Sequence, residues 1–487
     1  MYFNSLEFAF FLPFVFVLYW FLFNRGIKVQ NAFLVVASYF FYGWWDWRFL
    51  TLVIGSTLLD FVVANALRNE REESKRKMLL WTSISFNLGL LGFFKYFNFF
   101  IESFESAFSL FGAEFGRDSI RIILPVGISF YTFQTLSYTI DVYKRKIDPS
   151  RDLVSFAAFV CFFPQLVAGP IERSTHLLPQ FYQRRKLGYP AAVDGMRQIL
   201  WGLFKKVVIA DNCGEFANVI FNNSNEFSGA SLFLGAILFA FQIYGDFSGY
   251  SDIAIGTSRL FGFNLKQNFA FPYFSRDVAE FWRRWHISLS TWFRDYLYIP
   301  IGGSKGDKLS KVRNVFIIFI ASGFWHGANW TFITWGAFNA FLFLPLLLAA
   351  SNKKHTRIVA EGKHLPNPKE LVQMLGTFSL IALGWIFFRA DDIDHASNYM
   401  KSMFMGLIGK HSYVQALNFI VWQIGFELPL MLLFFMVIEW IGRHRRYALE
   451  GIDYRSSRLA RWLFYYLVLF FIFYYQGQEQ QFIYFQF

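Results

Sequence analysis

SGFWHGANW, residues 322–330, interrupts an apolar region that runs from residue 315 to residue 350. A helix needs about 20 residues to cross a bilayer, so this region allows two passes only if the chain reverses tightly near its middle. Gly323 and Gly327 suit such a reversal because glycine permits close backbone approach and local unwinding. We therefore expect a helical hairpin with His326 near its turn. An ionisable side chain at membrane depth is costly, so His326 is predicted to have a functional role.

The composition of the whole chain is typical of a membrane protein. Hydrophobic residues make up 55% of the 487 residues and charged residues only 16%, whereas a soluble domain carries about 25% charged residues. The apolar residues occur in runs long enough to span a bilayer. These features exclude a soluble globular protein and a disordered chain. They predict an all-α polytopic integral membrane protein in contact with membrane lipid.

Positive charge is concentrated in short loops between the apolar runs. The net charge is +12, and one strongly charged loop is RNEREESKRK, residues 68–77. Such loops are typical of the cytoplasmic side under the positive-inside rule. No separate basic domain is present, so a nucleic-acid partner is not expected. The first apolar run, residues 8–23, lacks a basic leader and a cleavage site, so we interpret it as a retained span.

We expect residues 1–487 to form a single membrane domain. Its three parts are N-terminal spans in residues 1–118, core motifs in residues 119–350 and C-terminal spans in residues 351–487. In the stretch from residue 153 to residue 212, Pro164, Gly169 and Pro170 break the helical pattern. Basic loops lie on both sides of its apolar part, residues 153–173, which favours a re-entrant segment. Residues 413–440 are expected to form one later span.

A second histidine, His286, lies in EFWRRWHISLSTWFRDYLYIPIGG, residues 280–303. If residues 277–293 form one helix, the i, i+3 and i+4 spacing gathers aromatic side chains and this histidine on one face. That face holds Trp282, Trp285, His286, Leu289, Trp292 and Phe293, and the other holds Asp277, Glu280, Arg283 and Arg284. We interpret the aromatic face as a cavity wall. The alternative is an amphipathic interfacial helix, where Trp and Arg are common anchors.

Other polar residues in apolar surroundings are candidates to support the site. Asp246 and Asp252 lie in YGDFSGYSDIAIG, residues 244–256, which we expect to be bent. Glu172 and Arg173 end the re-entrant stretch. A buried ion pair or a helix cap explains each of these four residues equally well. Asp295 has Arg294 beside it, and an interfacial ion pair is its default interpretation.

The residues that flank His326 are expected to line a pocket. These are Trp325, Asn329 and Trp330. An imidazole has a pKa near 6.5, so it can take a proton from a hydroxyl near neutral pH. The alternative for His326 is a histidine that bonds between helices without a chemical role.

Motifs for metal, nucleophile and phosphate chemistry are missing from the sequence. The eight histidines show no HExxH spacing, and Cys161 and Cys213 form no CxxC or disulfide pattern. There is no G-x-S-x-G elbow and no phosphate-binding glycine loop. We therefore expect no metal and no bound cofactor.

Several long motifs together resemble those of the membrane-bound O-acyltransferase family. In chain order they are LPVGISFYTFQTLSYTIDVY, FFPQLVAGPIER, YGDFSGYSDIAIG, FWRRWHISLSTWFRDYLYIPIGG, GFWHGANW and the C-terminal FIYFQF. The resemblance is closer to the bacterial alginate O-acetyltransferase branch, and more distant to the D-alanyl transferase of teichoic acid. The N-terminal MYFNSLEFAFFLP also looks typical.

The resemblance implies a ring of transmembrane helices with re-entrant segments around a central funnel. His326 matches the principal catalytic histidine of the family, and His286 lies in the second histidine motif. The implied reaction passes an acetyl group from a cytosolic thioester such as acetyl-CoA across the bacterial cytoplasmic membrane. The acetyl group then reaches an exported polysaccharide such as alginate through an extracytoplasmic SGNH-type partner.

The substrate-binding residues expected around the two histidines come from all of these motifs. They are Trp282, Arg283, Arg284, Trp285, Asp295, Trp325, Asn329, Glu172, Arg173, Asp246 and Asp252. Arg283, Arg284 and the loop 305–311 have the charge to attract coenzyme A phosphates, although positive-inside bias explains the loop lysines equally well.

Three other functions remain open from the sequence. A transporter or flippase of an acylated lipid or glycan would use the same polar interior without chemistry. A D-alanyl-type transferase would use a different acyl donor. A binding scaffold for an extracytoplasmic polysaccharide-modifying enzyme is the third.

Overall fold

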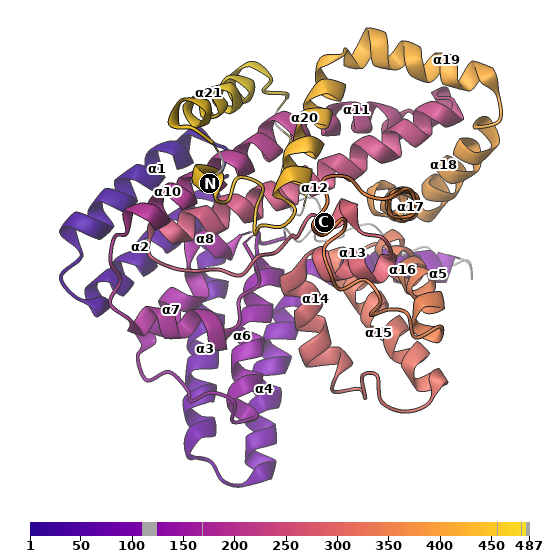
Figure 1. Cartoon of the computed structure of the whole chain (residues 1–487). Coiled ribbons are helices and arrows are strands. Elements are labelled where there is room, and N and C mark those ends of the chain that lie inside the picture. Colours follow the sequence, from indigo (N-terminus) through magenta and orange to yellow (C-terminus); the bar gives the residue numbers. More distant parts are fainter. Residues whose placement is uncertain (110–123, 168, 455, 479, 484–487) are drawn as a thin grey trace. The chain divides into compact units, whose positions relative to one another are not determined.

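The computed structural model describes residues 1–109, 124–167, 169–454, 456–478 and 480–483. Throughout these residues the regular elements are helices, and no strand occurs among them (Figure 1). The all-α prediction is therefore confirmed. The predicted ring of helices around a funnel stays a prediction.

The chain divides into two compact units. The first consists of Met1–Ala192 with Thr257–Lys266, and the second of Val193–Gly256 with Gln267–Phe487. Each unit has its own packed interior, and each is described by itself.

The first unit is built around three packed helices, α3 (Leu50–Asn69), α4 (Glu73–Leu91) and α6 (Ile128–Tyr143). Its other helices are α1 (Leu6–Val17), α2 (Ile27–Asp46), α5 (Phe97–Ser109), α7 (Leu153–Cys161), α8 (Phe163–Leu166) and α9 (Ser174–Leu177). A buried carboxylate, Asp60, joins the three packed helices, because it accepts hydrogen bonds from Asn87 Nδ2 and Thr139 Oγ1, both at 2.9 Å. The shortness of α8 and α9 agrees with the breaks predicted at the prolines and Gly169.

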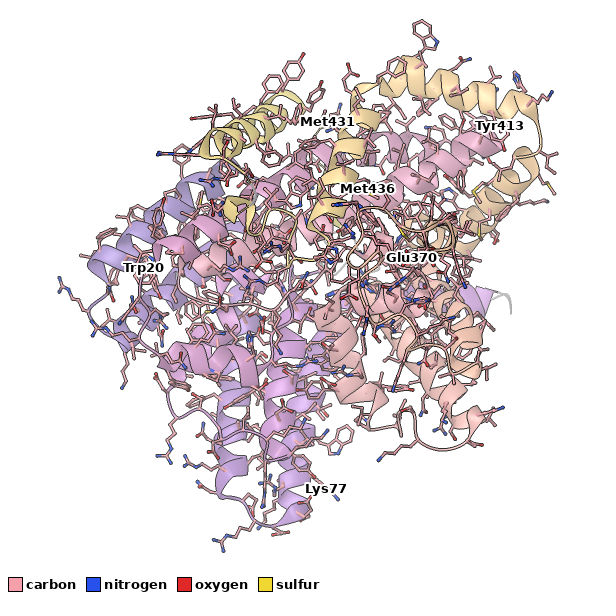
Figure 2. The ribbon with its side chains drawn as sticks, viewed as in Figure 1. Trp20, Lys77, Glu370, Tyr413, Met431 and Met436 are labelled. Atoms are coloured by element: carbon pink, nitrogen blue, oxygen red, sulfur yellow. The ribbon has the colours of Figure 1, made fainter. Side chains whose placement is uncertain are left out.

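The second unit contains the helices that position the candidate site. Its main helices are α11 (Asp211–Asn222), α13 (Val278–Arg284), α14 (Ile287–Phe293), α15 (Lys308–His326), α16 (Trp330–Leu348), α17 (Pro368–Arg389), α18 (Ile393–Gly406), α19 (Lys410–Phe419), α20 (Glu427–Gly442) and α21 (Arg458–Tyr474). Most of α10 (Tyr189–Leu203) and of α12 (Gly229–Leu260) also belongs to this unit. Glu370, labelled in Figure 2, closes the first turn of α17 in a capping box with Asn367.

Five helical segments of the described chain are long and apolar enough to cross a membrane. They are Ile27–Asn69, Glu73–Glu105, Gly229–Leu260, Trp330–Leu348 and Pro368–Arg389. A sixth is counted if Lys410–Ile424 and Glu427–Gly442 form one bent span. The predicted first span falls in the apolar but shorter helix Leu6–Leu22.

The predicted hairpin is present and explains the glycines around His326. Helices α15 and α16 pack side by side, joined by the three residues 327–329 (Figure 1). A Cβ at Gly323 would collide with the carbonyl oxygen of Phe332, and one at Gly336 with that of Phe319. The two helices therefore approach each other at positions where only glycine fits.

Two local predictions were wrong. Residues 277–293 form two helices, α13 and α14, because the chain takes a left-handed conformation (φ 44°) at His286. The stretch 244–256 is not bent but lies inside the continuous helix α12, where Gly249 and Gly256 allow close contact with Gly202 and Gly195 of α10.

The span predicted for residues 413–440 stays a prediction, because the two helices there count as one span only if the bent pair crosses as a unit. The chain bends there by 93° between Ile424 and Glu427. The bend is possible because Gly425 takes a positive φ of 76°.

Candidate active site

The two candidate histidines line the same cavity in the second unit. This cavity has a volume of about 260 Å³, and its walls come from α13, α14, α15 and α16 and the segments that connect them. Its lining includes Trp282, Trp285, His286, Phe319, Ser322 and His326. His286 and His326, which are 40 positions apart in the sequence, therefore line one cavity.

His326 is the last residue of α15 and is almost completely buried. Its imidazole meets the rings of Trp335 on α16 and Phe388 on α17 edge-on, at centroid distances of 5.0 and 5.3 Å. The ring of the neighbouring Trp325 lies at 4.9 Å. Three aromatic rings thus fix the position of the imidazole beside the cavity.

His286 lies between α13 and α14, outside the five apolar segments, and is also buried. Its Nδ1 is 3.1 Å from Oδ1 of Asn268, and its ring packs against Phe247 at 4.6 Å and Trp325 at 5.9 Å. Burial lowers the pKa of His286 to about 3, because the charged imidazolium loses its hydration. The side chain is therefore neutral at physiological pH.

Trp282 and Trp285 both contribute to the cavity wall. The ring of Trp282 contacts Phe319 and Trp335, both at 5.6 Å, and the ring of Trp285 contacts Trp385 at 5.0 Å. The wall therefore continues into an aromatic cluster from α16 and α17.

The predicted arginines do not line this cavity. Arg283 donates hydrogen bonds to the carbonyl oxygens of Asn352 and His355, both at 2.7 Å. Arg284 forms an ion pair with Glu280 at 2.8 Å. Arg294 does line the cavity, and its Nε is 2.8 Å from Oδ1 of Asp295. The default interpretation of Asp295 as the partner of Arg294 is confirmed.

The residues around His326 have structural contacts of their own. Asn329 caps α16, because its Oδ1 accepts a hydrogen bond from the Thr331 amide at 3.0 Å, and its Nδ2 donates to the Asp391 carbonyl at 2.8 Å. Trp325 is buried between the two histidine rings, whereas Trp330 is 54% exposed. Trp325 thus packs against both histidines, and Asn329 holds the end of the hairpin.

Asp246 and Asp252 form buried ion pairs, as one of the two alternatives predicted. Asp246 lies 2.9 Å from Nζ of Lys206, and it also accepts a hydrogen bond from the main-chain amide of Ile483 at 2.7 Å. Asp252 lies 2.5 Å from Nζ of Lys205. Neither aspartate lines the cavity of the two histidines.

Glu172 and Arg173 belong to the first unit and are buried there. Glu172 lies 2.7 Å from Nδ1 of His176 and accepts a hydrogen bond from the main-chain amide of Lys266. Glu172 thus ties the end of the re-entrant stretch to the segment that returns to this unit after α12.

The sequence-based reasoning did not assign four residues to the surroundings of the histidines, and it named one of them, Arg294, only as the partner of Asp295. They are Asn268, Arg294, Trp335 and Phe388. Trp335 and Phe388 lie on strongly apolar helices, where the sequence does not distinguish residues that face the site from residues that face lipid. Asn268 lies in a loop with no periodic pattern. Among the described residues, no group of three or more His, Cys, Asp or Glu side chains is placed to hold a metal ion.

Comparisons with known proteins agree with the resemblance of the motifs. The model of the membrane-bound O-acyltransferase family matches residues 144–381, which include both histidines. The probable alginate O-acetylase AlgI of Pseudomonas aeruginosa is 37% identical over 92% of this chain and 82% of its own length.

Two further relatives carry different names. The peptidoglycan O-acetyltransferase of Helicobacter pylori is 36% identical over 84% of this chain and 80% of its own length. The teichoic acid D-alanyltransferase of Streptococcus thermophilus is 30% identical over 54% of this chain and 68% of its own length. Together with the apolar helices, these matches indicate a multi-pass membrane protein.

Proposed function

Because the chain belongs to the membrane-bound O-acyltransferase family, we propose that this O-acyltransferase acetylates an exported glycan. The acetyl group would pass from a cytosolic thioester, acetyl-CoA, to an acceptor hydroxyl on the far side of the membrane. The observation that carries the proposal is the cavity of about 260 Å³ lined by both His286 and His326.

The shape of this cavity suits an extended thioester arm. Its lining on α15 runs from Val315 to His326, a helical distance of about 16 Å at 1.5 Å per residue. Polar side chains, among them Arg294, Tyr298 and Asn352, also belong to the lining. An apolar cavity that contains a cationic group, here Arg294, favours a long ligand with an anionic head.

The hairpin supports a direction of transfer. Lys308 begins α15 and Leu348 ends α16, so the basic segments before and after the hairpin lie at the same end of it. The positive-inside rule places that end in the cytoplasm. His326 lies at the opposite end, where Phe388 near the end of α17 packs on it. The donor would therefore enter from the cytoplasm and the acceptor from outside.

The chemistry requires proximity, an oriented hydroxyl and a base, because a thioester is already activated. We assign His326 as the general base or acyl-handling residue. As base, it takes the proton of the acceptor hydroxyl while the oxygen attacks the thioester carbonyl. The C–S bond then breaks, and the proton passes to the departing thiolate. His286, whose pKa is lowered to about 3 by burial, is a poor base and would instead orient the donor.

The cellular setting is part of the proposal. The relatives named for alginate and peptidoglycan favour the bacterial cytoplasmic membrane and an exported acceptor. An extracytoplasmic SGNH-type protein is the proposed partner that receives the acetyl group and completes the modification.

The proposal is tested by His326→Ala in proteoliposomes supplied with radiolabelled acetyl-CoA. Loss of a general base lowers the rate by about 10²- to 10⁴-fold, so acetyl transfer per folded molecule should fall by that factor, while the cavity left by the smaller side chain lowers the melting temperature only in part. His411→Ala is the matched control, because His411 is exposed on α19. Acetyl transfer at the wild-type rate by the His326→Ala variant would refute the assignment of His326 as the catalytic residue.

The same assay separates the alternative functions. A transporter or scaffold would leave the thioester unconsumed. A D-alanyl-type enzyme would transfer label from a D-alanyl thioester and not from acetyl-CoA.

A further inference from the structure

Asn268, in the loop between α12 and α13, forms several hydrogen bonds with the segment that carries His286. Its Oδ1 lies 3.1 Å from Nδ1 of His286 and accepts hydrogen bonds from the amide and Oγ of Ser288, at 3.2 and 2.8 Å. Its main-chain carbonyl accepts a hydrogen bond from the amide of Ile287 at 2.9 Å. Asn268 and His286 are both almost fully buried.

These contacts determine which nitrogen of His286 carries the proton. A main-chain N–H can only donate, so the Asn268 atom that faces the Ser288 amide must be the carbonyl oxygen. A carbonyl oxygen can only accept, so the His286 Nδ1 that faces it must carry hydrogen. The other end of the carboxamide agrees, because Nδ2 of Asn268 donates to Oγ of Ser251 at 3.1 Å.

We propose that Asn268 is a positioning residue that holds His286 as the Nδ1–H tautomer. The lone pair then lies on Nε2, on the ring edge remote from Asn268. His286 is a lining residue of the histidine cavity, whereas Asn268 is not. The inference rests on the proposed function only for its consequence in catalysis.

The consequence is a restriction on what His286 can bind. A neutral imidazole with its lone pair on Nε2 accepts hydrogen bonds at that atom and cannot donate one there. His286 therefore orients a substrate group that donates, a hydroxyl or an amide N–H such as those of an acyl-thioester arm. It does not stabilise the oxyanion that forms when the thioester carbonyl is attacked, because that role requires a donor.

Asn268 also has a structural role, which the test must separate from positioning. His286 occupies the left-handed region, which is unfavourable for a non-glycine residue. Asn268 satisfies the first two amides of α14, those of Ile287 and Ser288, and so helps to hold this turn. Loss of stability alone would therefore not support the proposal.

The decisive measurement is the tautomer of His286 in protein labelled with ¹⁵N-histidine in lipid, without substrate. The signal of His286 is assigned from its loss in His286→Gln. In wild type and in Asn268→Asp the hydrogen should be on Nδ1, because both side chains present an oxygen acceptor. In Asn268→Leu, whose side chain has the same number of heavy atoms and the same branching but no acceptor, the Nε2–H form should become populated.

Activity supplies the second readout. Loss of one neutral hydrogen bond corresponds to a change of up to about tenfold, so Asn268→Leu should lose transfer by about that factor. Asn268→Asp should keep most activity, and its carboxylate should raise the pKa of His286 and so move the acidic limb of the pH profile upward. Asn339→Leu is the control, because Asn339 is a buried amide that bonds only within α16, to the Trp335 carbonyl, in the contacts described.

Two results would overturn the proposal. One is a His286 that remains Nδ1–H in Asn268→Leu. The other is a wild-type His286 with its hydrogen on Nε2. Either result stands whether or not the protein transfers acetyl groups, because neither measurement uses a substrate.

Discussion

At the scale of single residues, the two histidines have different surroundings and therefore different uses. His326 is held by aromatic rings from three positions. His286 is held by a hydrogen bond to Asn268 and by its place in a strained turn. The ring of Trp325 contacts both histidine rings, with centroid distances of 4.9 Å to His326 and 5.9 Å to His286.

The buried state of His286 predicts a specific pH dependence of stability. Burial lowers its pKa to about 3 in the folded protein, compared with about 6.5 in an unfolded chain. Between these values the unfolded state binds more protons, so stability falls as the pH drops from about 6.5 towards 3. As the pH falls through this range, the free energy of unfolding should drop less steeply in His286→Gln than in the wild type. The difference should be up to about 1.4 kcal/mol per pH unit.

Thermal unfolding in detergent between pH 6.5 and 4 measures this difference. His411→Gln, an exchange at an exposed histidine, should behave like the wild type. Parallel curves for His286→Gln and the wild type would show that His286 is not buried in its neutral form.

At the scale of elements, the hairpin of α15 and α16 is what places His326. Its two helices touch through glycines, and the residue after His326 already leaves the helix with an extended backbone. Phe332 fills the space against Gly327, where a Cβ would collide with its ring. The position of His326 therefore depends on close packing at Gly323 and Gly327, where no side chain would fit.

A methyl group at Gly323 should separate the two helices. Gly323→Ala brings a Cβ against the Phe332 carbonyl, and overpacking of this kind costs about 1–3 kcal/mol. We expect a lower melting temperature and at least tenfold weaker acetyl transfer, because His326 lies three residues further along the same helix. Gly376→Ala is the matched control, since no atom lies within 4 Å of a Cβ built there. Equal melting temperatures for the two variants would contradict this packing.

At the scale of the whole molecule, the charge distribution predicts a membrane orientation. The basic residues before α15 and before α17 should lie in the cytoplasm under the positive-inside rule. The apolar helix Pro368–Arg389 then carries the chain to the other side, where α18 begins. This orientation is what makes the proposed acetyl transfer an export step.

Cysteine accessibility tests the orientation. Lys308→Cys and Lys363→Cys should react with a membrane-impermeant maleimide only from the cytoplasmic side, and Asp394→Cys only from the opposite side. All three positions are exposed. The background should be low because the natural cysteines, Cys161 and Cys213, are buried. Reaction of Lys363→Cys and Asp394→Cys from the same side would exclude a full crossing by α17.

The local sequence determined the class of the protein, its long apolar helices and the hairpin around His326. Apolar helices and a tight turn at glycines depend on residues that are close together in the chain, so both features can be predicted from the sequence. The same reasoning failed at residues 277–293, because it assumed one continuous helix. The structure has a turn at His286, which is stabilised by Asn268 from outside that stretch.

Only the tertiary structure decided that His286 and His326 face one cavity, and which partners the buried polar groups have. Lys206 meets Asp246, and Asn268 meets His286, over separations that no periodic pattern encodes. A buried polar group must find a partner wherever packing provides one. The stretch 322–330 thus supplied His326 and its tight turn, whereas the folded chain brought His286 to the same cavity and placed Asn268 beside it.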